Sequence, residues 1–271
     1  MAPFHCLTFL TDYGLEDGFV AACHGVCAQI APGARIIDIT HLIPAGDVRR
    51  GAAVLAQTLP YLPPAVHVAV VDPGVGTARR GVAVAAGGAV FIGPDNGLLS
   101  WAVAVAGGAS RAVSLTNREL WLAAVTPTFH GRDIFMPVAA RLLSGAALDS
   151  AGEEIDAGGL VTLPAPVSRV HDGEAEGEVM TVDTFGNVQL SITRSDAARI
   201  GIRSGANVVV RWAHRTLTVP YRETFGAVAP GDLVAYADGS GLVSLAVNGG
   251  NAAQRLALPP GARVRLAAAT R

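Results

Sequence analysis

Four short polar segments carry the residue types that bind charged groups or move protons. They are Thr11-Asp12-Tyr13-Gly14, Asp72 through Arg80, Thr128 through Asp133, and Asp183 through Asn187. Carboxylates can grip hydroxyl or ammonium groups through charge-assisted hydrogen bonds. An arginine can stabilise negative charge, and a histidine can accept a proton from water. Together these residues could bind a small polar molecule and carry out acid–base chemistry beside it.

Each segment also has a purely structural interpretation. Asp12 could cap the helix that follows it, and Asp72-Pro73-Gly74 could form a turn without chemistry. His130 could be a loop histidine, with Asp133 as a helix N-cap. Asp183 through Asn187 could be a hairpin loop. Taken one at a time, the segments do not decide between these interpretations.

The composition excludes several classes of protein. Of 271 residues, 51% are apolar, which is enough for a sizeable core, and the net charge of −2 argues against a nucleic-acid partner. All 20 basic residues are arginine, so a P-loop lysine and a Schiff-base lysine are excluded. The sequence also lacks G-x-S-x-G, C-x-x-C and H-E-x-x-H motifs, which disfavours serine hydrolases, zinc ribbons and zincins.

The cysteines indicate the compartment. Cys6, Cys23 and Cys27 form an odd set, and we find neither a signal peptide nor a membrane-spanning run, so we expect a cytoplasmic protein without membrane association. Cys23 and Cys27 flank His24 at a spacing that could suggest a metal. We favour buried structural thiols and expect no metal and no cofactor. The loop Gly74-Val75-Gly76 does not match the dinucleotide fingerprint.

The elements that must position these segments form an α/β pattern in the first half of the chain. We predict strands at 6–10, 35–40 and 65–71, helices at 18–30 and 133–143, and a hairpin from 82–85 and 89–92. Such alternation predicts an N-terminal α/β domain with a largely parallel sheet, which we place at residues 1–165. Ligands bind such sheets at the carboxyl ends of strands, where Asp12 and Asp72 fall.

The second half is typical of an all-β domain. Pro164, Pro166 and the acidic stretch 172–178 resemble a linker. Short strands then follow closely, at 178–182, 188–192, 207–212, 216–219, 233–237, 242–247 and 263–267. This spacing is typical of a small antiparallel β-barrel or sandwich, which we place at residues 166–271.

An ordered series of motifs resembles the S-adenosyl-L-methionine hydroxide adenosyltransferase family, relatives of the fluorinating and chlorinating enzymes. The matching stretches are Phe9-Leu10-Thr11-Asp12-Tyr13-Gly14, Val70-Val71-Asp72-Pro73-Gly74-Val75-Gly76-Thr77, Arg79-Arg80, Gly93-Pro94-Asp95-Asn96-Gly97, Thr128-Phe129-His130-Gly131-Arg132-Asp133, Phe185-Gly186-Asn187 and Asn248-Gly249-Gly250-Asn251-Ala252-Ala253. The resemblance implies an enzyme that hydrolyses S-adenosyl-L-methionine, its small-molecule substrate, to adenosine and L-methionine. It also implies a C-terminal β-barrel and a homotrimer with active sites between neighbouring subunits.

The resemblance further implies a role for each matching residue. Asp72, Arg79 and His130 correspond to the set that prepares the attacking water. The expected substrate contacts are Asp12 to the ribose hydroxyls, Asp183 to the methionine ammonium, Ser240 to the methionine carboxylate, Asn187 and the Val247 backbone to adenine, and Phe129 and Phe225 as aromatic walls. Arg79 and Arg80 are adjacent, and the spacing from Asp72 favours Arg79 as the one that faces the site.

Two alternatives remain at this point. A halogenase of the same superfamily would need a dehydrated halide pocket, and those relatives carry a tyrosine where Asp72 stands. A non-catalytic protein could bind S-adenosyl-L-methionine or adenosine without turning it over. The combination of Asp72, Arg79 and His130 favours hydrolysis over both.

Overall fold

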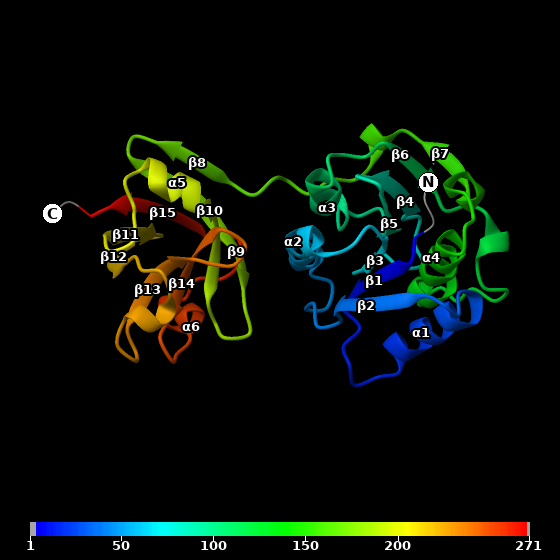
Figure 1. Cartoon of the computed structure of the whole chain (residues 1–271), viewed down its shortest axis with the longest axis horizontal. Helices are drawn as coiled ribbons and strands as arrows, with labels where there is room; N and C mark the ends of the chain where they lie inside the picture. Colours follow the sequence, from blue (N-terminus) through cyan, green and yellow to red (C-terminus); the bar gives the residue numbers. More distant parts are fainter. Residues whose placement is uncertain (1–3, 270–271) are drawn as a thin grey trace. The chain divides into compact units, whose positions relative to one another are not determined.

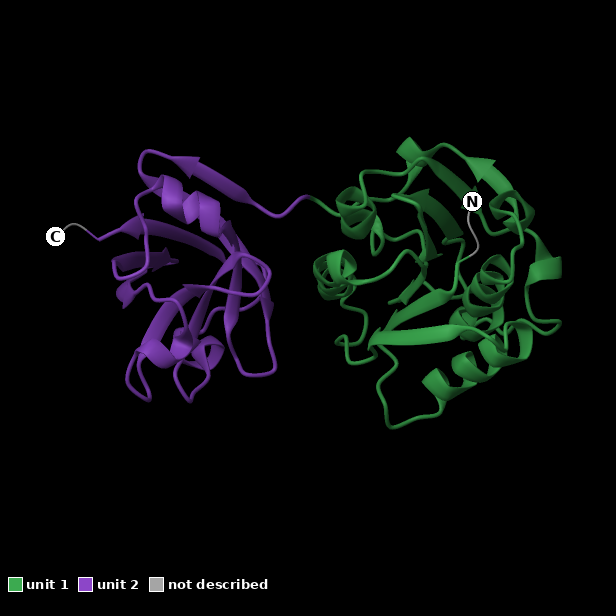
Figure 2. Ribbon diagram, in the orientation of Figure 1, with its two compact units in different colours: residues 1–164 green, residues 165–271 purple. Residues whose placement is uncertain are grey.

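The chain divides into two compact units, Met1–Pro164 and Ala165–Arg271, shown in separate colours in Figure 2. A computed structural model describes residues 4–269. The sequence pattern placed the domain boundary after residue 165, beside the division between the units.

The sheet of the first unit has parallel strands on one side and antiparallel strands on the other. Its order is β2-β1-β3-β5-β4-β6-β7. The strands are β1 Cys6–Thr11, β2 Arg35–Thr40, β3 Val66–Val70, β4 Gly81–Ala86, β5 Ala89–Pro94, β6 Arg111–Ser114 and β7 Glu153–Ile155. β2, β1, β3 and β5 pair in parallel, whereas β4 pairs antiparallel with β5 and β6, and β6 with β7. The predicted α/β class and the β4–β5 hairpin are confirmed.

Helices cover both faces of this sheet (Figure 1). They are α1 Phe19–Ile30, α2 Val48–Thr58, α3 Ser100–Val105 and α4 Met136–Leu143, with a π-helical turn, Gly131–Phe135, leading into α4. α1 and α4 pack in one apolar cluster with Leu7 and Phe9 of β1, and α2 and α3 pack in another with Leu10. This division follows from the alternation of side chains along a buried strand. Short 3-10 turns lie at Leu59–Tyr61, Arg118–Leu120, Leu148–Ala151 and Ala157–Gly159.

The second unit is a nearly closed antiparallel barrel, as the resemblance implied. Its strands are β8 Ser168–His171, β9 Glu174–Val182, β10 Val188–Thr193, β11 Asn207–Trp212, β12 Arg215–Pro220, β13 Leu233–Ala237, β14 Leu242–Val247 and β15 Arg263–Ala268. The order is β12-β11-β15-β9-β10-β14-β13, with β8 paired to β9, and an isolated bridge joins Tyr221 to Ala235 beside the two end strands. Two short helices, α5 Arg194–Arg199 and α6 Ala252–Leu256, and the 3-10 turn Phe225–Ala227 complete the unit.

The acidic stretch 172–178 is not a linker, as the sequence had suggested, but part of the β8–β9 hairpin. Asp172 and Gly173 both have positive φ, 47° and 75°, which is the conformation of a two-residue type I′ turn. Beyond the turn, buried Ala175 alternates with half-buried Glu174 and Glu176. Glu174 and Glu176 therefore lie on one face of a strand, and the linker interpretation mistook that polar face for a polar segment.

No helix among residues 4–269 is both long enough and apolar enough to cross a membrane.

Candidate active site

Arg79 joins Asp72 and His130 in a single cluster of side chains. Its Nε donates to Asp72 Oδ1 at 3.0 Å, and its Nη2 donates to Asp72 Oδ2. The same Nη2 lies 3.2 Å from His130 Nδ1. The Asp72 and Arg79 side chains are only 5% and 10% exposed. Three residues from two distant segments therefore form one partly buried, charged contact.

The cluster forms because two loops pack closely at the carboxyl end of β3. Asp72 follows β3, and the next residues turn tightly, with Val75 N–H donating to Asp72 O at 3.1 Å. Gly76 has φ +76°, and a Cβ at this position would lie 2.3 Å from the carbonyl oxygen of Pro127. Only glycine therefore permits this approach, which brings the loop of Arg79 against the segment that carries His130.

Burial and charge shift the pKa values of the cluster in opposite directions. Burial raises the pKa of Asp72 above 3.8, although the neighbouring Arg79 acts to lower it. Burial, together with the Arg79 charge, lowers the pKa of His130 below 6.5. At neutral pH the cluster therefore holds a neutral imidazole beside an Arg–Asp ion pair.

Arg80 points to a different partner. Its Nε and Nη2 both donate to Asp95 Oδ2, at 3.0 and 2.5 Å, and Nη2 also donates to Gly159 O at 3.0 Å. Of the two adjacent arginines, Arg79 is the one that contacts Asp72 and His130, as the motif spacing predicts.

Asp12 and Phe129 lie beside an aromatic cluster in the same unit. Asp12 follows β1, and its Oδ2 accepts a hydrogen bond from Gly46 N at 2.8 Å. Phe129 contacts Tyr13 and Phe19 edge-on, with ring centroids 5.5 and 5.4 Å apart. Asp12 directly precedes Tyr13, one of the rings of this cluster. The rings form an aromatic surface of the kind that can flank a flat ligand.

Tyr13 is a residue of this region that sequence reasoning left without a role. A Cβ on Gly131 would lie 2.0 Å from the Tyr13 hydroxyl oxygen, so the ring occupies the space that Gly131 leaves beside His130. Burial raises the pKa of Tyr13, so its hydroxyl stays protonated. Its position directly after Asp12 in the first motif was the available signal.

In the second unit, Asp183 organises the β9–β10 loop. Its Oδ1 accepts from the main-chain N–H of Phe185 at 2.9 Å and of Asn187 at 2.8 Å. Its Oδ2 accepts from the Asn187 side-chain amide at 2.8 Å. Asp183 thus fixes the position of Asn187, and sequence reasoning did not anticipate this link.

A cavity of about 610 Å³ brings together three of the predicted substrate contacts, Asn187, Phe225 and Val247. The other lining residues are Phe185, Gly249, Gly250 and Asn251. Phe185, at 77% exposed, has a largely uncovered ring that sequence reasoning had not assigned. Ser240 is not among the lining residues; it lies in a turn where its main-chain N–H donates to Asp238 Oδ1 at 2.8 Å.

Comparison with known proteins decides the family. The family model described as "SAM hydroxide adenosyltransferase N-terminal domain" matches residues 7–152. The model described as "SAM hydroxide adenosyltransferase C-terminal domain" matches residues 177–265. The chain belongs to this family. The "(R)-S-adenosyl-L-methionine hydrolase" of Salinispora tropica is 55% identical over 99% of this chain and 100% of its own length.

A solved structure and a more distant relative are also similar to this chain. A crystal structure of an uncharacterized conserved protein from Thermotoga maritima is 34% identical, with a TM-score of 0.90, and covers 96% of this chain and 99% of its own. A "Fluorinase" of Actinopolyspora mzabensis is more distant, at 28% identity over 96% of both chains. The predicted resemblance to the family is confirmed.

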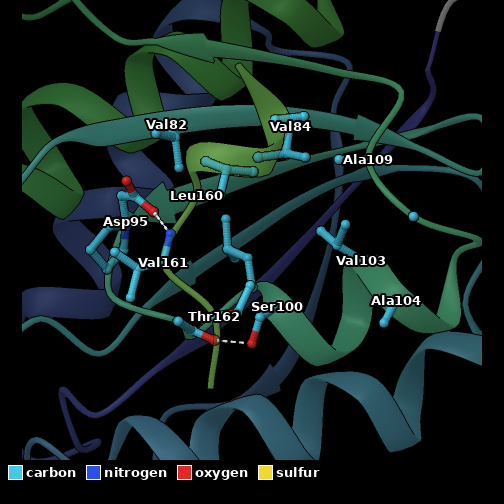
Figure 3. Close-up of a pocket in the computed structure, with 15 residues that line it drawn as sticks. Val82, Val84, Asp95, Ser100, Val103, Ala104, Ala109, Leu160, Val161 and Thr162 are labelled. Atoms are coloured by element: carbon cyan, nitrogen blue, oxygen red, sulfur yellow. Dashed lines mark hydrogen bonds between the residues drawn. The ribbon is translucent and has the colours of Figure 1, made fainter. Parts of the chain in front are cut away.

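A second pocket of this hydroxide adenosyltransferase family chain lies apart from the predicted site residues. It has a volume of about 210 Å³ and is lined mainly by apolar residues, including Val82, Leu99 and Val103 (Figure 3). At its edge, Asp95 Oδ1 accepts from Val161 N at 2.8 Å, so the carboxylate that pairs with Arg80 also holds the segment after Leu160. The polar groups here are engaged with one another, and the pocket gives no sign of chemistry.

Proposed function

We propose that this chain hydrolyses S-adenosyl-L-methionine to adenosine and L-methionine. The observation that carries the proposal is the contact of Arg79 with both Asp72 and His130. The names of close relatives support it, since the protein from Salinispora tropica is called a hydrolase of the (R) form of this sulfonium compound.

The chemistry of the substrate explains why such a small set of residues is sufficient. A sulfonium is already a good leaving group, so no acid is needed to expel methionine. What remains is in-line attack by water or hydroxide on ribose C5′, which forms the C5′–O bond as the C5′–S bond breaks. Alignment of the reactants and exclusion of bulk water should dominate such a step.

The hydrogen bonds of Arg79 limit where the water proton can go. A guanidinium only donates, so His130 Nδ1 acts as an acceptor and the proton of the neutral ring lies on Nε2. That hydrogen bond uses the single lone pair of Nδ1, so His130 can take a proton there only when the contact with Arg79 opens. The Asp72 carboxylate keeps further lone pairs beside Arg79 and is the proton acceptor that the cluster offers as it stands. The fixed positive charge of Arg79 favours hydroxide at this position.

The remaining predicted residues are proposed to hold the substrate. Asp12 would bind the ribose hydroxyls and Phe129 would flank the ligand, as the family resemblance implies. The cavity lined by Asn187, Phe225 and Val247 has room for an adenine ring and supports that part of the assignment. Ser240 and Asp183 would bind the methionine carboxylate and ammonium. No cofactor is needed for this reaction, because the substrate itself carries the activated carbon.

The proposed site draws on both units. Asp12, Asp72, Arg79, Phe129 and His130 belong to the first, and Asp183, Asn187, Phe225, Ser240 and Val247 to the second. We propose a homotrimer in which neighbouring subunits combine these two sets, which the family resemblance implies. We also propose a cytoplasmic location, which the three free thiols of Cys6, Cys23 and Cys27 support.

The decisive experiment is product analysis in heavy-oxygen water. Purified protein with S-adenosyl-L-methionine should release L-methionine and adenosine labelled at the 5′ oxygen. Parallel reactions with chloride and fluoride separate the halogenase alternative, which would give a 5′-halogenated adenosine. Unchanged ligand would indicate a binding protein, and adenine or methylthioadenosine as the main product would refute the assignment.

A further inference from the structure

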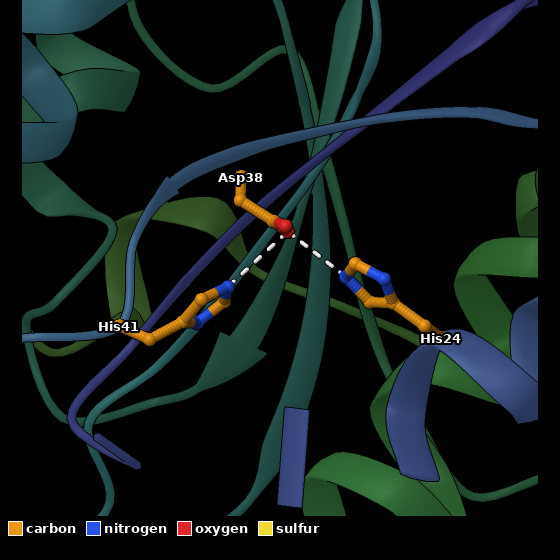
Figure 4. Close-up of side chains that lie close together, drawn as sticks. All are labelled: His24, Asp38 and His41. Carbon is orange, nitrogen blue, oxygen red and sulfur yellow. Dashed lines mark hydrogen bonds and ion pairs between the residues drawn. The ribbon is translucent and has the colours of Figure 1, made fainter. Parts of the chain in front are cut away.

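Three potential metal ligands meet at one end of β2, outside the proposed catalytic cluster (Figure 4). His24 lies on α1, Asp38 on β2, and His41 directly after β2. Asp38 Oδ1 lies 2.9 Å from His24 Nε2 and 3.2 Å from His41 Nε2. The three ligand atoms all lie within 4.8 Å of one another. The motif comparison assigned none of these residues a role.

The buried ring of His41 points its Nε2 at this meeting point, where the nearest group is the Asp38 carboxylate. Its side chain is 3% exposed, and among the described residues its Nε2 has no hydrogen-bond partner of acceptable geometry, although Asp38 Oδ1 is near. Its other nitrogen, Nδ1, lies 2.9 Å from Thr11 Oγ1. Thr11 Oγ1 also accepts from Tyr13 N at 3.1 Å, and its second lone pair can accept from His41 Nδ1–H. In that arrangement His41 presents the Nε2 lone pair to Asp38.

In this tautomer the Nε2 lone pair of His41 and the Asp38 carboxylate face each other as two acceptors, an arrangement that suits a shared cation. We propose that His24 Nε2, Asp38 Oδ1 and His41 Nε2 bind a divalent transition metal of the Zn²⁺ class. Two imidazoles and one carboxylate suit such an ion, whereas Mg²⁺ and Ca²⁺ prefer oxygen alone. The hydrogen bond from His41 Nδ1 to Thr11 is the outer contact that ligating histidines usually make.

Two of the three separations between ligand atoms already suit such an ion, and binding would draw the two histidine nitrogens, which lie within 4.8 Å of each other, closer together. Zn–N and Zn–O bonds of 2.0–2.1 Å at the tetrahedral angle place ligand atoms about 3.3 Å apart. The observed separations of 2.9 and 3.2 Å are close to this value. His24 and Asp38 side chains are 34% and 41% exposed, so they can adjust, and solvent can supply the fourth ligand.

The position of the site gives the metal a structural consequence. It would tie α1 to the end of β2 and hold His41, whose main-chain oxygen accepts from Gly14 N at 2.7 Å. Gly14 closes the Asp12 loop, so an ion here would stiffen the segment proposed to bind ribose. The role for ribose binding rests on the proposed function, but metal binding itself does not.

The test is titration of the untagged, metal-free chain with Zn²⁺, in the absence of S-adenosyl-L-methionine. Isothermal titration calorimetry should show one ion per chain. His24→Gln and Asp38→Asn should each weaken binding by at least the roughly 10- to 100-fold that loss of an outer-shell partner costs. His214→Gln alters an exposed histidine of the second unit and should bind like the unaltered chain. Circular dichroism checks that each variant is folded.

Co²⁺ in place of Zn²⁺ identifies the ligands. The unaltered chain and His214→Gln should show the visible bands of low-coordinate cobalt, and His24→Gln and Asp38→Asn should lose them. An intense near-ultraviolet thiolate-to-cobalt band would place the ion on a cysteine instead and overturn the proposal. Absence of metal binding, or equal affinity in the unaltered chain and the three variants, would also overturn the proposal. The three side chains would then only interact with one another.

Discussion

At the residue scale, Arg79 and His130 should act as a unit, because one guanidinium nitrogen contacts both Asp72 and His130. Arg79→Ala and His130→Ala should each slow single-turnover adenosine formation by roughly 10²- to 10³-fold. The double variant should lose little more, since either change removes the same water-positioning contact. Substrate affinity, measured by calorimetry, should change much less than the rate.

Two arginine variants serve as matched comparisons for this prediction. Arg79→Lys should also be slow, because an ammonium cannot contact Asp72 and His130 with a planar fork. Arg80→Ala should be nearly as active as the unaltered chain, since Arg80 contacts Asp95 and Gly159 instead. Multiplicative losses in the Arg79/His130 double variant would contradict a shared function.

The pKa directions predict where activity is lost on acidification. The neutral form of His130 is required, and its pKa is lowered below 6.5, so the rate should stay near its maximum down to that pH and fall only below it. The ionised form of Asp72, whose pKa is raised above 3.8, is lost on the same acidic side. Single-turnover rates measured from neutral to acidic pH test this prediction. A rate that has already fallen to half its maximum well above pH 6.5 would contradict it.

The variant Arg79→Gln tests what lowers the pKa of His130, without a measurement of catalysis. Arg79→Gln removes a positive charge that lowers the pKa of His130, so that pKa should rise. Nitrogen-15 NMR of the imidazole ring measures this pKa directly, and an unchanged value would show that the Arg79 charge does not lower it.

Sequence could predict this cluster only through the ordered motifs. Asp72 and Arg79 lie seven residues apart, but His130 is 51 residues beyond Arg79, and nothing in the chain order brings it near. The close approach at Gly76 and Pro127 does so. The same limit explains why His24, Asp38 and His41 escaped notice: sequence reasoning considered His24 with Cys23 and Cys27 on one helix, whereas its partners follow on the next strand.

At the element scale, the β1–β3 pair contains a buried histidine that should make stability depend on pH. His67 lies opposite Thr8 in the register, 2.8 Å from the hydroxyl, and stacks on Phe91. Burial lowers its pKa from 6.5 to about 4. Between pH 6.5 and about 4, His67 is therefore protonated in the unfolded chain but neutral in the folded chain. The free energy of unfolding accordingly falls as the pH drops from 6.5 towards 4. The loss from this group is on the order of 3 kcal/mol.

Urea unfolding of the unaltered chain and of His67→Phe measures this contribution. The phenylalanine keeps the ring stacked on Phe91 but cannot titrate. The variant should therefore lose less stability than the unaltered chain between pH 6.5 and 4, whatever its stability at neutral pH. Parallel pH dependences would assign the acid sensitivity to other groups.

The strands that are buried along their whole length were predictable from sequence, whereas the amphipathic helix α2 was not predicted. β1, β3 and β5 are buried along their whole length and read as strands from sequence alone. α2 was not predicted, although its apolar residues follow a helical period and it buries Gly51, Ala52, Ala53 and Leu55. Its N-cap, Asp47, which accepts from Arg50 N at 2.9 Å, was a further signal.

At the scale of the whole molecule, shared sites can be tested by complementation. Asp72→Ala damages the set of residues on the first unit and Asp183→Ala the set on the second. If neighbouring subunits combine the two sets, an equal mixture after subunit exchange should recover roughly a quarter of the unaltered activity, because about one site in four receives two intact halves. Light scattering should report a trimer.

The matched controls are each variant alone and the mixture before exchange, all of which should stay inactive. Recovery would be absent if each chain built its site from its own two units. Full activity of a demonstrated monomer would exclude the shared site altogether.

The reactivity of Cys23 and Cys27 can report how often α1 detaches from the sheet. Both thiols are fully buried against the sheet, and burial raises the pKa of Cys23 to about 12 and that of Cys27 above 9.0. A disulfide reagent can therefore reach them only when the helix detaches, so the labelling rate measures the free energy of local opening. Phe19, in the first turn of α1, contacts Phe129 of the proposed ligand wall. Adenosine should accordingly slow labelling of both thiols, and mass spectrometry of quenched samples would reveal equal rates if helix and wall are uncoupled.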